Sequence, residues 1–288
     1  MTVFWVNGSL VPREQAVVPV LDHGLLYGDG VFEGIRFYHR RPFRLGAHRR
    51  RLERSAAALR LTLPYCAAEL DEAVSALIEA FDGDEGYIRL IVTRGEGPMG
   101  LDPAACPRPN VILIATQLEM VPQPVREAGA RLIIAATRRL SADGLDPRIK
   151  TLNYLNPLLA RLEAAHAGAD EAVLLNAGGR VAEGTADNLF IVRDGCLLTP
   201  PTSEGALAGI TRALVLELAG AAGLAAAELP LAPYDLYTAD ECFLTGTGAE
   251  LIPVREVDGR PLGACPGPVF VSLLEAFRAC VAAETGGA

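Results

Sequence analysis

Lysine is almost absent from this sequence of 288 residues: of the 26 lysine and arginine side chains, only Lys150 is a lysine. Arginine therefore serves nearly everywhere that a positive charge is needed. Lysine differs because its amine can lose its proton when buried and act as a nucleophile, whereas the guanidinium stays charged. The single lysine indicates amine chemistry at position 150, such as Schiff-base formation. The alternative is a surface lysine retained by chance.

The sequence also lacks features that define several other classes of protein. No segment approaches the roughly 20 consecutive apolar residues that span a membrane, and the N-terminus has no pattern of a secretory signal. The six cysteines form no CxxC pair, so no zinc or other metal site is predicted. The net charge of −9 argues against a nucleic-acid-binding protein. We expect a cytoplasmic protein with reduced thiols.

The apolar pattern predicts a mixed α/β (α+β) protein of two domains. Helices are expected at 45–61, 67–81, 155–168, 209–223 and 268–284, with strands between them and hairpins at 2–11 and 31–45. Pro122 and Pro124 disfavour both a helix and a central strand. We therefore place a linker at 121–129, between an N-terminal α/β domain at 1–120 and a C-terminal α/β domain at 130–288 that carries Lys150.

A Schiff-base lysine requires either a carbonyl substrate, as in an aldolase, or the aldehyde cofactor pyridoxal 5'-phosphate. The cofactor requires a phosphate site, an acid at the pyridine nitrogen and a donor near the ring oxygen. Gly209 to Thr211 begin a helix whose unpaired N–H groups suit a phosphate. The glycine-rich stretch from Thr245 to Glu250 is a second candidate. Glu183 is the candidate acid, although a turn glutamate and a glycine before a helix also have ordinary structural explanations.

Six segments occur in an order that is typical of one enzyme family. They are "LDHGLLYGDGVFEGIRFY", "HRRRLERS", "IKTLNYLNPLLA", "EGTADNLFIV", "GITR" and "TGTGAELIPV". Over nearly the whole chain, this order resembles the fold-type IV pyridoxal-phosphate enzymes, the class IV aminotransferase family. The resemblance implies a two-domain fold with the active site at the domain interface. It also implies a homodimer, or a higher oligomer, with composite active sites, in which Tyr27 and the loop at 99–101 reach the neighbouring subunit.

The resemblance also implies roles for individual residues. Lys150 is expected to form the Schiff base with pyridoxal phosphate and then to move the proton of the substrate α-carbon, while Glu183 pairs with the pyridine nitrogen. The other implied cofactor contacts are Tyr154 at the ring oxygen, Leu207 against the ring, and Arg51, Ile210, Thr211 and Thr247 around the phosphate.

Within the family, the expected substrate positions resemble the branched-chain type. Apolar side chains at Met99 and Leu101 suit leucine, isoleucine or valine, and Arg89 suits the distal carboxylate of glutamate. The D-amino acid type instead has arginine and histidine at 99 and 101, and tyrosine at 32. The full set of substrate positions implied is Tyr27, Phe32, Gly34, Tyr87, Arg89, Met99, Leu101, Gly248 and Ala249.

The function implied is a transaminase that moves the amino group of an L-amino acid, of the branched-chain type, to 2-oxoglutarate by a ping-pong mechanism. The substrates are small amino acids and 2-oxo acids, and neither a membrane nor a nucleic acid is an expected partner. The alternatives within the family are a D-amino acid or (R)-amine transaminase and aminodeoxychorismate lyase. Outside it, the alternatives are a cofactor-free aldolase and a binding protein that has lost the chemistry.

Overall fold

The computed structural model of the protein describes residues 1–287 and divides into two compact units. The first unit contains residues 1–118, 149–153 and 281–287, and the second contains residues 119–148 and 154–280. The short segment with Lys150 is therefore grouped with the first unit, although its place in the sequence predicts that it belongs to the C-terminal domain. Pairing between residues more than 100 positions apart causes this difference and is described below.

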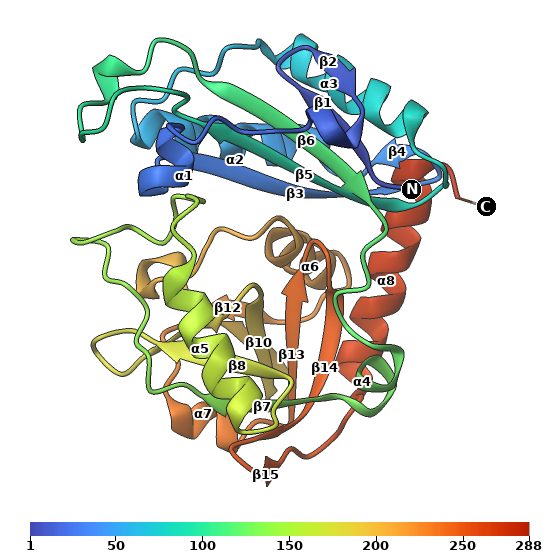
Figure 1. The fold of residues 1–288 in the computed structure, drawn as a ribbon. Helices are drawn as coiled ribbons and strands as arrows, with labels where there is room; N and C mark the ends of the chain where they lie inside the picture. The colour runs from blue at the N-terminus through green and yellow to red at the C-terminus, as the bar shows by residue number, and fades with distance from the viewer. Residues whose placement is uncertain (288) are drawn as a thin grey trace. The chain divides into compact units, whose positions relative to one another are not determined.

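The first unit is built on a six-stranded antiparallel sheet (Figure 1). Its strands lie in the order β2-β1-β6-β5-β3-β4. Their bounds are β1 Val3–Val6, β2 Ser9–Val11, β3 Gly30–Tyr38, β4 Arg41–Pro42, β5 Gly86–Thr93 and β6 Asn110–Thr116. The helices of this part of the chain are η1 Arg13–Gln15, α1 His23–Tyr27, α2 Leu45–Ala58, α3 Ala67–Ala80 and η2 Pro103–Ala105. The predicted hairpins at β1–β2 and β3–β4 are confirmed.

The core of the first unit forms where helices α2 and α3 cover one face of the sheet. Helix α2 packs on β3, and helix α3 packs on β1 and β6. Leu52 and Ala56 of α2 are fully buried, as the helical spacing predicts. They pack with Val31, Ile35 and Phe37, which alternate along β3 and so point to the same side of the sheet.

The second unit contains a nine-stranded mixed sheet in the order β12-β11-β10-β13-β14-β7-β8-β9, with β15 paired to β14. Strand β7 runs parallel to both β14 and β8, and β11 runs parallel to β12. The strands are β7 Ala130–Ile134, β8 Glu171–Leu175, β9 Val181–Gly184, β10 Asn188–Arg193, β11 Cys196–Thr199, β12 Ala226–Glu228, β13 Glu241–Gly246, β14 Glu250–Val257 and β15 Arg260–Pro261. The central strands are buried along nearly their whole length.

Helices pack against this second sheet. Helix α5 packs on β8, helix α6 on β13 and helix α4 on β14. Their bounds, with the remaining helices, are α4 Gln123–Ala128, α5 Leu155–His166, η3 Thr202–Glu204, α6 Ile210–Ala221, α7 Pro233–Tyr237 and α8 Pro268–Thr285. No helix within residues 1–287 is both long enough and apolar enough to cross a membrane.

One expectation about the predicted linker is wrong. The prolines at 122 and 124 were expected to prevent a helix, but α4 forms at Gln123–Ala128. Pro122 is the N-cap and Pro124 lies in the first turn, where the missing N–H would have had no partner within the helix. The linker boundaries at 121–129 stay a prediction.

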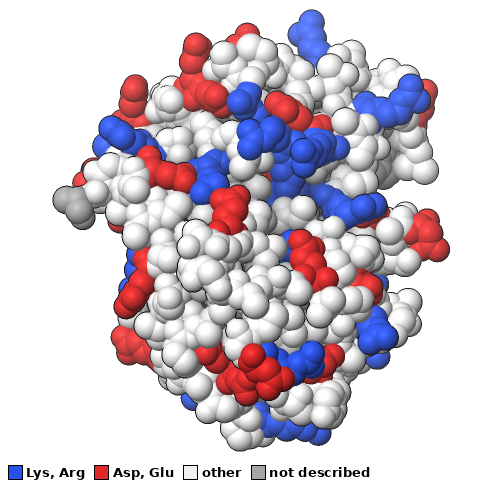
Figure 2. Space-filling view, turned by 180° about the vertical axis from the view of Figure 1, so that it is seen from behind, with Lys and Arg blue, Asp and Glu red and all other residues white. Residues whose placement is uncertain are grey.

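Charged side chains of both signs share the surface. The side of the molecule drawn in Figure 2 shows acidic and basic side chains close to one another, with basic ones gathered in its upper part. Within α2, Arg50 and Arg54 are exposed, whereas Arg51 is buried. Burial therefore distinguishes Arg51 within an arginine-rich segment that otherwise forms a solvated helix face.

The turn after β5 requires glycine at position 95. Gly95 has φ +93, and a Cβ there would lie 1.8 Å from the carbonyl oxygen of Arg108. We expect Gly95→Ala to destabilise the protein by more than the roughly 1–2 kcal/mol that a left-handed conformation costs an L-residue. Gly195→Ala is the matched control, because Gly195 has φ +71 but no atom within 4 Å of the added Cβ. Urea unfolding of both variants measures the difference; equal losses would contradict the steric account.

Candidate active site

In the first unit, Lys150 lies on the face of the sheet opposite the core. Phe32 and Gly34 alternate with the core residues of β3, and Tyr87 and Arg89 do the same on β5. The Nζ atom of Lys150 lies 4.6 Å from the centroid of the Phe32 ring. The guanidinium of Arg89 lies 4.4 Å from the centroid of the same ring. The structure thus brings together the predicted lysine and four of the predicted substrate residues.

Backbone hydrogen bonds hold Lys150 in this place. Its N–H donates to Oγ of Ser55 at 3.1 Å, and its carbonyl oxygen accepts from the N–H of Phe32 at 3.0 Å. Thr151 forms an antiparallel bridge with Val31, and the N–H of Leu152 donates to the carbonyl of Gly30 at 3.0 Å. These contacts explain why a segment distant in sequence belongs to the first unit. They fix the main chain of Lys150, and the side chain extends from that fixed point.

Gly34 is required by the side chain of Tyr87. A Cβ on Gly34 would lie 1.9 Å from the Tyr87 hydroxyl oxygen. The phenol therefore crosses the strand where a side chain at 34 would otherwise stand. The packing accounts for a glycine in the middle of a strand, where it is otherwise unfavourable.

A cluster of buried charged groups lies on the core side of the same strand. Glu33 accepts two hydrogen bonds from Arg51, each of 2.7 Å, and one from Nδ1 of His48 at 2.8 Å. Burial alone would raise the pKa of Glu33, but the charge and hydrogen bonds of Arg51, with His48, outweigh it and lower the pKa to about 2. Burial is also the main cause of a lowered pKa for His48. Glu33 and Arg51 therefore form a buried ion pair at neutral pH.

This cluster bears on the predicted role of Arg51. Its Nε and Nη2 atoms are both engaged with Glu33, so the orientation of the guanidinium is fixed by the protein itself. A phosphate contact from Arg51 stays a prediction. If it forms, the ion pair with Glu33 sets the position of the positive charge.

The remaining candidates of the first unit are exposed. The hydroxyl of Tyr27 accepts a hydrogen bond of 3.0 Å from the N–H of Gly100, which ties α1 to the loop at 99–101. Met99 and Leu101 are 79% and 81% exposed. Their apolar side chains are covered by no other part of the described chain.

In the second unit, Glu183 is buried and held by three donors. One carboxylate oxygen pairs with Nη2 of Arg139 at 2.7 Å. The other accepts from Nδ2 of Asn188 at 3.1 Å and from the N–H of Leu207 at 2.9 Å. This arrangement suits a charged carboxylate and keeps its orientation constant. The fold therefore holds the carboxylate of Glu183 in one position, which an ordinary turn glutamate would not show.

Helix α6 begins beside this carboxylate. Gly209 is its N-cap and has no side chain that could accept a hydrogen bond from the first turn, which contains Ile210 and Thr211. A Cβ on Gly209 would lie 1.9 Å from Oδ1 of Asn188, the residue that also holds Glu183. The first turn thus has N–H groups suited to an anion, next to the predicted acid.

The predicted turn residues Thr247, Gly248 and Ala249 connect β13 to β14. The carbonyl of Ala249 accepts from Nη1 of Arg126 at 3.0 Å. Gly248 has no room for a side chain, because its Cβ position lies 1.9 Å from Sδ of Met120. In the same unit, Tyr154 is the N-cap of α5 and lines a cavity of about 280 Å³ together with Ala249.

Five residues of these arrangements were not among the predicted site residues: Glu33, His48, Ser55, Arg139 and Asn188. Glu33 could have been found, because it occupies a core position in the alternation of β3 and a buried charge requires a partner. His48 could have been found from its place one turn before Leu52 on the buried face of α2. Asn188 lies five residues after Glu183 in the segment "EGTADNLFIV", so this segment could have indicated it. No local signal marks Arg139, which contacts Glu183 from a distant part of the sequence.

Known proteins share this fold and sequence. Residues 30–257 match the family described as Amino-transferase class IV. A protein of Methanocaldococcus jannaschii named "Putative branched-chain-amino-acid aminotransferase" is 48% identical, over 95% of this chain and 94% of its own length. The branched-chain amino acid aminotransferase of Escherichia coli has a crystal structure that matches with a TM-score of 0.94 and 37% identity, covering 99% of this chain and 95% of that one.

A further solved structure is that of the branched-chain amino acid aminotransferase of Thermobaculum terrenum in its PLP-form, the holo-form. It matches with a TM-score of 0.88 and 33% identity, covering 99% of this chain and 94% of that one. The family model and these relatives show that the protein is an aminotransferase. The chain belongs to the class IV aminotransferase family, and its similarity extends over whole branched-chain enzymes.

The Glu33–Arg51 pair has consequences for stability. Folding lowers the pKa of Glu33. The stabilisation that its charged form gives to the folded protein is therefore present in full well above pH 4.5, the ordinary value of this pKa. It is lost as the pH falls toward about 2. We expect Glu33→Gln to cost roughly 3–5 kcal/mol at neutral pH, because Arg51 is left as a buried charge without its counter-ion. Urea unfolding at pH values from 7 downward measures this loss of stability. The difference in free energy of unfolding between the wild type and Glu33→Gln should become smaller as the pH falls.

The control is Asp146→Asn, which breaks the pair of Asp146 with the exposed Arg148. Exposed ion pairs contribute little, so this variant should unfold near the wild-type midpoint at neutral pH. A Glu33→Gln protein as stable as this control would contradict the account of the buried cluster.

Proposed function

We propose that the protein is a branched-chain-amino-acid aminotransferase that uses pyridoxal 5'-phosphate. The observation that carries the proposal is the position of Lys150: the only lysine of the chain is fixed by its backbone on a sheet face that also presents Arg89 and Tyr87. A chance surface lysine would have no such support.

The residues present fit this cofactor. The first unit supplies an amine at Lys150. The second supplies a carboxylate at Glu183 and, at the start of α6, N–H groups without a side-chain cap. Amine, acid and anion site are the three elements that pyridoxal phosphate requires. We propose that Thr247 and Arg51 add to the phosphate contacts, that Tyr154 donates to the ring oxygen and that Leu207 packs on the ring.

The chemistry divides between cofactor and protein. Pyridoxal phosphate supplies an electron sink that stabilises the negative charge at the substrate α-carbon. Lys150 would hold the cofactor through Nζ, and the same amine would act as the base that moves the proton of the substrate α-carbon. Glu183 would hold a proton on the pyridine nitrogen, and Arg139 and Asn188 keep its carboxylate oriented for this task.

The substrates are small amino acids and 2-oxo acids. Leucine, isoleucine or valine donates the amino group and 2-oxoglutarate accepts it in a ping-pong cycle. Phe32 and Tyr87 offer apolar ring surface for the branched side chain, and Arg89 offers a cation for the distal carboxylate of glutamate. We propose that Gly34, Gly248 and Ala249 allow the substrate to approach the backbone.

Lys150→Arg tests the catalytic role, because it retains the charge but cannot form a Schiff base. We expect the visible absorbance of the lysine-bound cofactor to vanish, and kcat/KM for L-leucine with 2-oxoglutarate to fall by at least roughly 10²–10⁴-fold. The matched control adds Arg148→Lys to this variant, so that the chain again has a single lysine, two residues away. It should stay inactive, whereas activity in either protein would refute the assignment.

A substrate panel tests the specificity. Initial rates are measured with L-leucine, L-isoleucine, L-valine and D-alanine as donors to 2-oxoglutarate. The three L-amino acids should be the effective donors. Activity with D-alanine alone would refute the branched-chain proposal while leaving the cofactor chemistry intact.

We further propose that the protein acts as a homodimer in the cytoplasm. The apolar side chains of Met99 and Leu101 are exposed on a loop that Tyr27 holds, and a second subunit would cover them. No disulfide joins Cys66, Cys106, Cys196, Cys242 or Cys265, which suits a reducing compartment.

Light scattering on the wild type and on a Met99→Ser, Leu101→Ser double variant tests the dimer. A dimeric wild type and a shift of the variant toward the monomer are expected. A wild type that is monomeric at assay concentration would refute the proposed assembly.

A further inference from the structure

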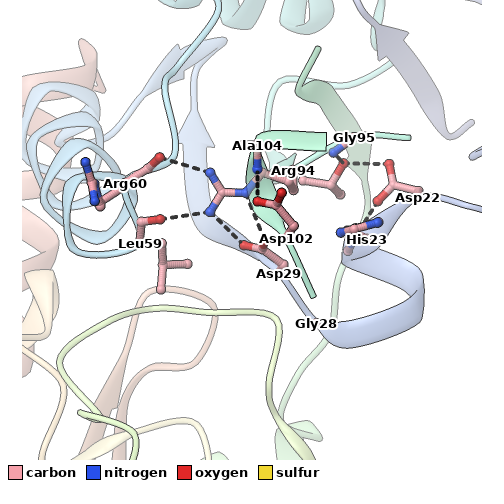
Figure 3. A network of polar contacts seen from close by, with 12 residues as sticks. Asp22, His23, Gly28, Asp29, Leu59, Arg60, Arg94, Gly95, Asp102 and Ala104 are labelled. Carbon is pink, nitrogen blue, oxygen red and sulfur yellow. Dashed lines mark hydrogen bonds and ion pairs between the residues drawn. The ribbon is translucent and has the colours of Figure 1, made fainter. Parts of the chain in front are cut away.

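A charged network in the first unit links the elements that hold Lys150. Arg94 follows the last residue of β5, and Asp29 precedes the first residue of β3. The guanidinium of Arg94 donates to both carboxylate oxygens of Asp29, at 2.8 and 3.0 Å. The N–H of Arg94 also donates to the carbonyl of Asp29 at 2.9 Å. Figure 3 shows this fork, with Arg94 lying between Asp29 and the chain at Leu59 and Arg60.

The same guanidinium also binds the end of helix α2. Its Nη2 and Nη1 atoms donate to the carbonyls of Leu59 and Arg60, at 2.8 and 2.9 Å (Figure 3). The carbonyl end of a helix favours a positive charge. One buried arginine therefore joins the end of α2 to the start of β3.

These two elements make the contacts that position Lys150. Helix α2 contributes Ser55, which accepts from the N–H of Lys150. Strand β3 contributes the N–H of Phe32, which donates to the carbonyl of Lys150, and the carbonyl of Gly30, which accepts from Leu152. Immediately before Asp29, the carbonyl of Gly28 accepts from Nδ2 of Asn153 at 2.9 Å.

The turn that carries Asp29 is fixed on its other side as well. The N–H of Asp29 donates to the carbonyl of His23 at 3.2 Å, and the N–H of His23 donates to the carbonyl of Gly95 at 2.9 Å. Asp22 receives hydrogen bonds from Thr93 and Gly24, each of 2.7 Å. These hydrogen bonds hold the main chain around Asp29. We therefore expect a change at its carboxylate to affect its neighbours Gly28 and Gly30.

We propose that Arg94 and Asp29 are positioning residues for Lys150. By joining α2 to β3, the pair sets the distance between the hydrogen-bond partners on either side of the Lys150 backbone. Neither residue needs to touch the substrate. The inference rests on the proposed function, because positioning Lys150 matters for the reaction only if Lys150 carries out the chemistry.

The test compares holoenzyme variants. Asp29→Asn removes the charge at nearly constant shape, and Arg94→Lys keeps the charge but loses the planar fork. The matched controls are Asp235→Asn and Arg193→Lys, which alter the Arg193–Asp235 pair of the second unit. Asp29 and Asp235 have similar side-chain exposure, 24% and 20%, so the two aspartate variants make the same chemical change in comparable surroundings. Arg193 is more exposed than Arg94, 39% against 9%, so Arg193→Lys controls for the chemical change alone.

Two readouts are taken on each protein: kcat and KM for transamination, and hydrogen–deuterium exchange of the peptide that contains residues 149–153. In the Asp29 and Arg94 variants we expect kcat to fall on the order of 10–100-fold, the effect of a displacement near 1 Å, with a much smaller change in KM. The amides of Lys150 and Leu152 should exchange faster. The two control variants should keep wild-type kcat and wild-type exchange in this peptide.

The inference is overturned if Asp29→Asn and Arg94→Lys match their controls in either readout. A loss of kcat without faster exchange at 150 and 152 would mean that the pair does not act through the lysine segment. Faster exchange with unchanged kcat would mean that the placement does not matter for the reaction. A wild type without transaminase activity would instead refute the proposed function, and the exchange measurement would still report on the link between the pair and the segment.

Discussion

The hydrogen bonds of the Lys150 backbone are the constraint on which the proposed chemistry depends. The N–H of Lys150 is bound by α2 through Ser55, and its carbonyl is bound by β3 through Phe32. A long, flexible side chain becomes useful only when its main chain is fixed, because the amine then samples a small volume. The six-stranded sheet and the helix that covers it provide that fixed base.

Two ion pairs of the first unit involve the same two elements, α2 and β3. The Glu33–Arg51 ion pair joins β3 to the middle of α2. The Asp29–Arg94 ion pair lies at the start of β3, and Arg94 also binds the end of α2. Both pairs are substantially buried, so removal of one partner leaves an uncompensated charge. In the second unit a buried carboxylate is likewise held by an arginine: Glu183 is bound by Arg139 and also by Asn188. Arginine is thus used for structure, while the single lysine is kept for reactivity.

Much of this arrangement could be predicted from the sequence because its signals are local. The alternation along β3, the spacing of Leu52 and Ala56, and the glycine before α6 each identify an element within a few residues, and the scarcity of lysine marks Lys150. The grouping of Lys150 with the first unit could not be predicted in this way. It arises from the pairing of Thr151 with Val31, and such long-range pairing has no local pattern. Arg139 was missed for the same reason, because it contacts Glu183 from a distant part of the sequence.

The central claim is that Lys150 carries the cofactor. Borohydride reduction of the holoenzyme, followed by peptide mapping with mass spectrometry, tests it most directly, because the chain offers no other lysine. The account predicts one phosphopyridoxyl group on the peptide that contains Lys150. Reduction that leaves this peptide unmodified, or places the group on the N-terminal amine, would contradict the account.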